Sequence, residues 1–355
     1  MDEKNKYHPI LSKKGPWKNN NNSIWLASTV AMHRNLEKFM FPAKLSAEGR
    51  KQVCAFVIKD LLSNAVLANP FVLLAEEMST NDKEFLVEHF LSRHSFTQAH
   101  LGEAFVLDET GEFLAAVNLA DHLCLQWLDC HEELEASWER LVKIEMQLIK
   151  NVGFAFSSKF GFLTADPMIC GTALSVQVLL HLPALTYSNR FEEIVKKYQD
   201  EGIERTGLQG NPHEMVGDIV AFHNQYTLGV TEENILSALR TLTTRLLVEE
   251  KSARTNMKNE NPYEMKDRVS RAYAILLHSF QIESIEAFNA ISLLKLGLDL
   301  GWLTNTTHAR LNELLFNCRR AHLLCECDEK LAHEEIPHKR AEFIHKALQG
   351  VSLLI

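Results

Sequence analysis

The chain has 355 residues, 46% of them hydrophobic and 23% charged, and a formal net charge of −9 at pH 7. This composition is typical of a folded globular protein that is long enough for two domains. The negative charge argues against a general attraction to nucleic acid or to an anionic membrane. No apolar run reaches the roughly 18 residues of a membrane span, and the N-terminus lacks the apolar core of a signal peptide. We therefore expect a cytoplasmic protein.

The seven cysteines are an odd number spread along the chain, which indicates reduced thiols rather than a disulfide framework. Cys318, His322, Cys325 and Cys327 are residue types that ligate zinc. Free cysteines on a buried helix account for the same cluster more simply. We expect no bound metal.

The elements expected in the first part of the chain include both helices and strands. Residues 1–23, with a polar asparagine run, predict a flexible N-terminal arm. Helical spacing with a serine cap predicts a helix over 45–67, and an acidic first turn predicts another from about residue 80. Alternating residues around a turn at 108–111 predict a hairpin over 103–119. Later come strands at 123–128, 160–164 and 218–228 and a helix over 132–150.

From Thr231 onward the pattern is helical. Amphipathic segments predict helices over 232–256, 263–280, 284–299, 307–327 and 335–349. The chain is therefore expected to have an α+β domain over 24–255 and a helical domain over 256–355.

Two neighbouring segments carry a recognisable signature. Thr164–Ser175 reads TADPMICGTALS, and Leu180–Leu185 reads LHLPAL. This pattern resembles the phosphagen (guanidino) kinases, most closely the bacterial protein-arginine kinases of the McsB type. Further segments resemble the same family in the same order: Gly15–Trp17, Leu26–Leu36, Asn118–Gln126, Asn224–Gly229, Asp267–Tyr273, Leu296–Gly301 and Leu311–Leu314. The resemblance implies an antiparallel β-sheet of eight strands flanked by helices, followed by a helical C-terminal domain that dimerises.

The same resemblance implies a cage of arginines around the phosphates of ATP. Phosphoryl transfer depends mainly on positioning and on neutralising phosphate charge, which planar guanidinium groups do bidentately. None of the corresponding nucleotide-clamp positions is an arginine in this sequence. They are Thr29, Ala31, Cys124, Ser175 and Thr206.

The acidic groups implied by the resemblance are also replaced. The signature cysteine is Asp166, and the positions of the carboxylates that orient a guanidinium are Leu119, Ala120 and Asn211. Asparagine cannot serve as a carboxylate base. Asp121 and Glu214 remain as residual acids, at the outer positions of the two motifs.

Two arginines are candidates for residual contacts with an anion. Arg205 lies beside Thr206, and a one-residue shift in alignment would restore it to the clamp. On a strand, however, such a shift reverses the face on which a side chain lies. Arg340 lies in the segment that corresponds to a phosphoarginine-recognition motif, of which the first half is missing. A solvated helix face is the alternative there. Arg34 is expected to be structural.

We therefore predict a catalytically degenerate protein-arginine kinase homologue, a pseudokinase that acts as a scaffold or adaptor and needs no cofactor. The resemblance implies protein partners, such as an activator protein or Clp-type protease components, and a homodimer formed through the C-terminal domain. Two alternatives stay open. One is an active but divergent protein-arginine phosphotransferase that uses Mg-ATP. The other is a new ligand in the vacated pocket, such as an arginine side chain with Asp166 as counter-ion.

Overall fold

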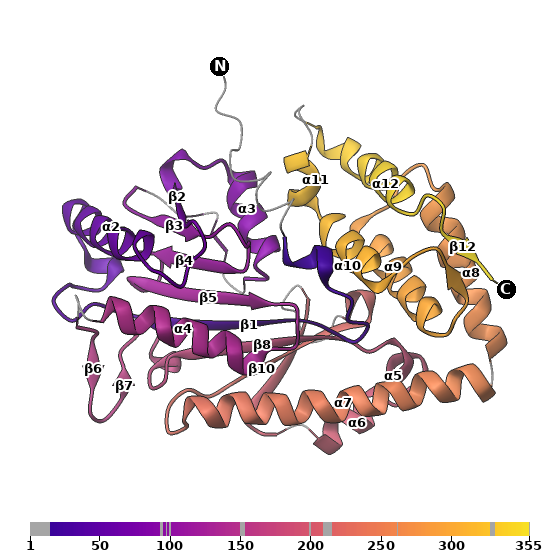
Figure 1. The fold of residues 1–355 in the computed structure, drawn as a ribbon, viewed down its shortest axis with the longest axis horizontal. Helices are drawn as coiled ribbons and strands as arrows, with labels where there is room; N and C mark the ends of the chain where they lie inside the picture. Colours follow the sequence, from indigo (N-terminus) through magenta and orange to yellow (C-terminus); the bar gives the residue numbers. More distant parts are fainter. Residues whose placement is uncertain are drawn as a thin grey trace. The chain divides into compact units, whose positions relative to one another are not determined.

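The computed structural model describes residues 15–92, 95–96, 98, 101–149, 153–198, 200–208, 215–260, 262–326 and 331–354 (Figure 1). By its internal contacts the chain divides into two compact units. The first consists mainly of Ser28–Gln177 and His223–Ala238, and the second of Trp17–Ala27, Val178–Phe222 and Leu239–Ile355. Helix α7 (Glu232–Glu260) runs unbroken through the expected domain boundary at residue 255, which stays a prediction.

The strands form a sheet of eight, which confirms the α+β class. Neighbouring strands pair antiparallel from β2 through β3, β4 and β5 to β1. All ten residues of β1 are buried, as expected for a strand inside a sheet. In order across the sheet the strands are β2 (Phe71–Leu74), β3 (Ala104–Leu107), β4 (Phe113–Val117), β5 (Leu123–Asp129), β1 (Trp25–Arg34), β8 (Leu174–His181), β10 (Ile219–Asn224) and β9 (Ile203–Gly207).

Two helices of the first unit begin close to the residues that the sequence predicts. In α2 (Ala47–Leu62) the Ser46 hydroxyl accepts a hydrogen bond from the Gly49 amide at 3.1 Å. A full capping box of Ser79 and Asp82 starts α3 (Thr80–His89). Helix α4 (Leu134–Leu148) buries one apolar stripe and packs against β5. The expected strand over 160–164 is shorter, because only β7 (Gly161–Phe162) pairs there, with β6 (Phe156–Ser157).

The second unit is mainly helical, as expected. The predicted helix over 307–327 is instead two helices, α10 (His308–Asn317) and α11 (Arg320–Glu326). The break occurs where Arg319 Nε donates to the Phe316 carbonyl at 2.7 Å, a side-chain substitute for helical backbone bonding. The other helices of this unit are α5 (Pro183–Tyr187), α6 (Phe191–Tyr198), most of α7, α8 (Pro262–His278), α9 (Ser284–Asp299) and α12 (Ile336–Ala347). A short pair of strands, β11 (Leu303–Thr304) and β12 (Ser352–Leu353), completes it.

The expected flexible arm over 1–23 is wrong for residues 15–23, and residues 1–14 lie outside the described part of the chain. Trp17, on the short 3₁₀ helix η1 (Pro16–Asn19), is 2% exposed and stacks on Phe316 with ring centroids 3.6 Å apart. The Asn312 side-chain amide donates to the carbonyls of Asn20 and Asn22, at 2.9 Å each. Hydrogen bonds to its backbone and a buried tryptophan therefore fix this segment in place.

A buried carboxylate fixes the start of α5. Glu250, on α7, is 0% exposed. Its oxygens accept hydrogen bonds from the amides of Ala184 and Leu185, at 3.0 and 2.9 Å, and from Arg254 Nε at 2.7 Å. A carboxylate at a helix N-terminus satisfies amides that lack helical partners, and here it also balances a buried guanidinium.

A row of hydrogen-bonded, buried polar side chains in the second unit determines which of its groups carry hydrogens. His181 Nδ1 lies 3.3 Å from the Ser23 carbonyl, and Nε2 lies 2.8 Å from the Ser292 hydroxyl, which in turn lies 2.6 Å from Asp218 Oδ2. Burial and the nearby cations Lys295 and Arg254 lower the pKa of His181 well below its usual value, so the imidazole is neutral.

The carbonyl of Ser23 can only accept, so Nδ1 of His181 carries the hydrogen and Nε2 must accept from Ser292. Ser292 then donates its one hydroxyl hydrogen to His181. The hydrogen bond between Ser292 and Asp218 therefore needs a hydrogen from Asp218, which must be protonated. Burial raises the pKa of Asp218 to about 6, despite the opposing contact with Ser292. Geometry and burial thus both favour a neutral Asp218 acid in the folded state below about pH 6.

The signature glycine Gly171 sits where a side chain cannot fit. Its φ is +113°, and a Cβ there would lie 2.2 Å from the Thr227 carbonyl oxygen. The same carbonyl accepts from the Thr172 amide at 2.9 Å, while the Thr227 hydroxyl donates to the Cys170 carbonyl at 2.8 Å. The glycine therefore holds the signature loop against residue 227.

Replacing Gly171 with alanine is expected to lower the free energy of unfolding by about 2 to 3 kcal/mol, because both backbone strain and a backbone clash are introduced. Urea unfolding followed by circular dichroism measures the change. Gly229→Ala is the matched control, since Gly229 also has a positive φ (+79°) but nothing lies within 4 Å of its Cβ position. Equal losses in the two variants would show that the contact with Thr227 contributes nothing.

Candidate functional site

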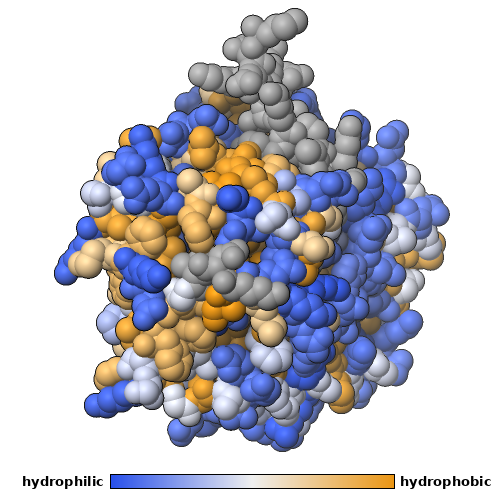
Figure 2. Space-filling model, turned by 60° about the vertical axis from the view of Figure 1, so that its left-hand side comes forward, coloured by the Kyte–Doolittle hydropathy of each residue, from blue (hydrophilic) through white to orange (hydrophobic). Residues whose placement is uncertain are grey.

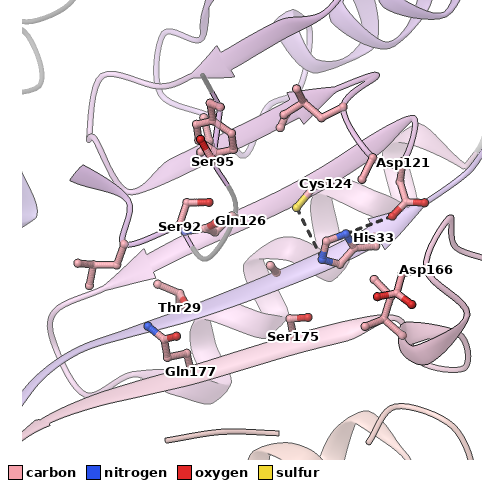
Figure 3. A pocket seen from close by; sticks show the side chains of 18 of the residues that line it. Thr29, His33, Ser92, Ser95, Asp121, Cys124, Gln126, Asp166, Ser175 and Gln177 are labelled. Atoms are coloured by element: carbon pink, nitrogen blue, oxygen red, sulfur yellow. Dashed lines mark hydrogen bonds and ion pairs between the residues drawn. The ribbon is translucent and has the colours of Figure 1, made fainter. Parts of the chain in front are cut away.

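The pleat of the sheet brings small and polar side chains to one cavity of the first unit. Successive side chains of a strand point to opposite faces, so alternate residues share a face. Cross-strand register places Ala31 opposite Gln126 and His33 opposite Cys124. These residues line a cavity of about 490 Å³, drawn in Figure 3, together with Thr29 of β1 and with Ser175 and Gln177 of β8.

Most of the positions singled out in the sequence lie in this cavity. Its lining includes four of the lost clamp positions, Thr29, Ala31, Cys124 and Ser175. It also includes Leu119, Ala120, Asp121 and Asp166. The remaining lining comes from Leu91, Ser92, Ser95, Phe96, Leu114, Ala116, Ile169 and Val176. The positions inferred from the resemblance are therefore neighbours in space.

Of the described positions, Thr206 is not among the cavity's lining. Thr206 lies on β9 in the second unit and is half-buried. Asn211 and Glu214 lie outside the described residues.

The charge of the cavity is unlike that of a nucleotide site. Its described lining contains the carboxylates Asp121 and Asp166 and the imidazole of His33, and includes neither lysine nor arginine. A triphosphate needs fixed cations or metal ions around its oxygens. The cavity as lined favours a neutral or cationic occupant instead.

Both candidates for an anion contact already bond to other groups of the protein, although Arg205 Nη1 has no hydrogen-bond partner among the described residues. Arg205 Nη2 donates to Glu192 at 2.8 Å within the second unit. Arg340 is 3% exposed, and it donates to the carbonyls of Cys318 and Ile282 at 2.9 Å each. The expectation that Arg340 contacts an anion is therefore wrong, because its guanidinium satisfies buried carbonyls.

Arg34 is structural, as expected. It is 1% exposed, pairs with Glu145 through Nε, and stacks its guanidinium 3.6 Å from the centre of the Phe162 ring. Nη1 donates to the carbonyls of His33 and Thr172.

One end of the cavity holds a thiol, an imidazole and a carboxylate in line (Figure 3). Cys124 Sγ lies 3.9 Å from His33 Nε2, and His33 Nδ1 lies 3.4 Å from Asp121 Oδ2. Burial lowers the pKa of His33, but Cys124 and Asp121 outweigh it and raise that pKa to about 10. Both neighbours therefore favour the protonated imidazole.

His33 is the functional residue that sequence reasoning missed. Its position opposite Cys124 depends on the register between β1 and β5, which are separated by almost 90 residues. The sequence alone identifies Asp121 as a residual acid and Cys124 as a position where the family has an arginine, and it does not connect either residue with His33. The sequence does contain a signal for His33. Alternate residues of a strand share a face, so His33 is expected on the same face as Thr29 and Ala31.

The described residues form neither a metal-binding cluster nor a membrane-spanning helix. No group of three or more histidine, cysteine, aspartate or glutamate side chains among the described residues is arranged to hold a metal ion, and Cys327 lies outside those residues. None of the described helices is both long and apolar enough to cross a lipid bilayer.

Comparison with known proteins defines the class first. Residues 57–253 match the family model of the ATP:guanido phosphotransferase C-terminal catalytic domain. Lombricine kinase has a similar fold, with a TM-score of 0.58 at 18% identity, covering 70% of this chain and 71% of that chain. The fold is that of the phosphagen kinases.

The particular family follows from the second half of the chain and from relatives that match almost end to end. Residues 262–353 match the model of the protein-arginine kinase McsB C-terminal domain. The protein-arginine kinase of Chlamydia pneumoniae is 35% identical over 342 residues, 93% of each chain. That of Halothermothrix orenii is 32% identical over 325 residues, which is 92% of this chain and 93% of the relative. The chain belongs to the protein-arginine kinase family.

Proposed function

We propose that this chain is a catalytically degenerate member of its family, a pseudokinase that acts as a protein-interaction scaffold or adaptor. The observation that carries the proposal is the lining of the cavity. Four positions that would hold phosphate-binding arginines converge there as Thr29, Ala31, Cys124 and Ser175, and the described lining adds two carboxylates but neither lysine nor arginine. Each preorganised charge stabiliser that is lost costs about 10²–10³ in rate, so several losses leave little phosphoryl transfer.

The scaffold part of the proposal draws on the retained fold. The described surface carries exposed large apolar side chains, including Phe156, Met168 and Tyr263. Figure 2 shows hydrophobic residues gathered over parts of the face turned forward there. Contiguous apolar surface is typical of sites that contact other proteins.

The proposed partners and state follow the family analogy. We infer protein partners, such as an activator protein or Clp-type protease components, and a homodimer formed through the helical C-terminal domain. The proposed location is the cytoplasm. No cofactor is required by this function.

The alternative function is an active but divergent ATP:protein-arginine phosphotransferase. It is supported by the names of the relatives, which are protein-arginine kinases. It would require Mg-ATP to be held by cations that the described lining of the cavity does not supply.

Isothermal titration of the full chain with Mg-ATP is expected to give no binding heat, because neither lysine nor arginine belongs to the described lining of the cavity. Restoring the arginines in T29R/A31R/C124R/S175R is expected to create measurable binding, with thermal melting as the control for folding. A dissociation constant in the micromolar range for the unmodified chain would contradict the proposal. Acid-labile phosphate on arginine after incubation with Mg-ATP would establish the alternative.

A further inference from the structure

The cavity has a chemical capability that a scaffold does not use. Cys124, His33 and Asp121 are in line, with 3.9 Å from sulfur to imidazole and 3.4 Å from imidazole to carboxylate. A nucleophile beside a base, with the base oriented by a third group, is the arrangement that nucleophilic catalysis requires. A neighbouring imidazolium also stabilises the reactive thiolate form of a cysteine.

The arrangement is held in place from behind. Asp121 Oδ1 accepts from Asn35 Nδ2 at 2.6 Å and from the Ala165 amide at 2.7 Å, which leaves Oδ2 directed at His33. Asp121 and His33 are 3% and 5% exposed, whereas Cys124 is half-buried and lines the cavity. The two supporting groups are therefore fixed, and the sulfur is open to a ligand.

Other cysteines of the described chain lie in different surroundings. Cys54 is buried, and burial raises the pKa of its thiol to about 11. The sulfur of Cys318 is buried and donates to the Leu315 carbonyl. These thiols are internal controls for the reactivity of Cys124.

The carboxylates at this end of the cavity determine which charge a ligand should have. Asp166 precedes the 3₁₀ helix η4 (Pro167–Ile169) and lines the same cavity. Its neighbour Ala165 is bonded to Asp121, so Asp166 lies next to the three groups in line, as Figure 3 also shows. Asp166 is exposed, and no lysine or arginine belongs to the described lining. A planar cation with an electrophilic carbon fits this combination of carboxylate and thiol.

We propose that Cys124 is the nucleophile of a site that hydrolyses a guanidinium or amidinium group, with Asp166 as counter-ion, His33 as proton donor and acceptor, and Asp121 as the group that positions His33. The proposal goes beyond the scaffold function, which would survive its failure. It also differs from kinase chemistry, because the bond that breaks joins carbon and nitrogen.

The reaction balances with water alone. The thiolate adds to the central carbon, His33 gives its proton to one amino nitrogen, and that nitrogen leaves as ammonia. The carbon remains on sulfur as a thiouronium cation. Water then gives a proton to His33 and adds to the carbon, and the carbon–sulfur bond breaks to release a urea and the thiolate. The proton lost from the added oxygen converts ammonia to ammonium.

The first test compares two alkylating reagents of equal size, cationic 2-chloroacetamidine and neutral 2-chloroacetamide. In both reactions the thiolate displaces chloride. Peptide mapping by mass spectrometry is expected to show Cys124 labelled by the amidine about tenfold faster than by the amide, the effect of one close charge interaction. Asp166→Asn is expected to remove this preference and leave the amide rate unchanged. His33→Gln is expected to slow both reagents.

The controls are Glu201→Gln, which neutralises an exposed carboxylate in the second unit, and the labelling rate of Cys54 in the same samples. Thermal melting checks each variant for folding. Equal rates for the two reagents at Cys124, or an unchanged preference in Asp166→Asn, would overturn the cation site.

The second test measures turnover. The full chain is incubated with arginine, agmatine and an N-acetylarginine amide, and ureido product and ammonium are quantified. We expect equal amounts of both products from at least one compound, and none from the Cys124→Ser variant. No product from all three compounds, or product that survives in Cys124→Ser, would overturn the reaction.

Discussion

Replacing Glu250 with alanine is expected to lower the free energy of unfolding by about 3 to 5 kcal/mol, the usual cost of removing one partner from a buried ion pair. The variant leaves Arg254 buried without its carboxylate on α7 and leaves the amides of Ala184 and Leu185 without an acceptor. Both losses occur in the interior, where water does not replace the missing group. Urea unfolding at pH 7 measures the change.

Glu249 is the matched control for this prediction. It is the preceding residue on the same helix, partly exposed, and pairs with Arg190 at 3.5 Å. Glu249→Ala removes this pair and a hydrogen bond from the Tyr198 hydroxyl at 2.8 Å, and it is expected to cost about 1 to 2 kcal/mol. The double variant E250A/R254A is expected to lose less than the sum of its single variants, because Glu250 and Arg254 bond directly to each other, although Asp299 also loses Arg254 as a partner. Similar losses at 249 and 250 would refute the proposed role of burial.

The Asp218→Asn variant is expected to gain stability relative to the unmodified chain as the pH rises from 4 to 7. Burial raises the pKa of Asp218 from 3.8 to about 6, so the folded state holds this proton more tightly than the unfolded state. The stability contributed by the protonated acid is present below about pH 4 and is lost as the pH rises through about 6. The difference in pKa corresponds to about 3 kcal/mol, and asparagine has no such dependence.

The measurement is urea unfolding of both proteins at matched ionic strength between pH 4 and 7. The expected result is a difference in unfolding free energy that changes by about 3 kcal/mol over this range. Asp200→Asn, which neutralises an exposed carboxylate, should show no comparable trend. A constant difference for Asp218→Asn would mean that Asp218 is already ionised at pH 4 in the folded state.

Local patterns predicted the elements that depend on local bonding. The cap at Ser46 and the acidic first turn near residue 80 mark true helix starts, and the turn at 108–111 joins β3 to β4. The elements that failed depend on distant contacts. Trp17 is anchored by Phe316, which the polar run after it does not reveal. The break between α10 and α11 depends on how Arg319 folds back onto the Phe316 carbonyl.

The candidate site was predicted in position but not in chemistry. The family resemblance identified Thr29, Cys124 and Ser175 as neighbours, and the cavity contains all of them. The pairing of His33 with Cys124 required the register of two strands far apart in the chain. The burial of Arg340 required the packing of α12, since its sequence reads equally well as a solvated basic face.

The packing of the first described residues also constrains the order of events during synthesis. The side chain of Asn312 bonds to backbone 292 and 290 residues earlier, at Asn20 and Asn22, and Trp17 stacks on Phe316. A ribosome adds about 5–20 residues per second, so this early segment waits about 15 to 60 s for its partners. During that interval an aromatic ring and several backbone carbonyls remain without their final contacts. The second unit cannot close until almost the whole chain has been translated.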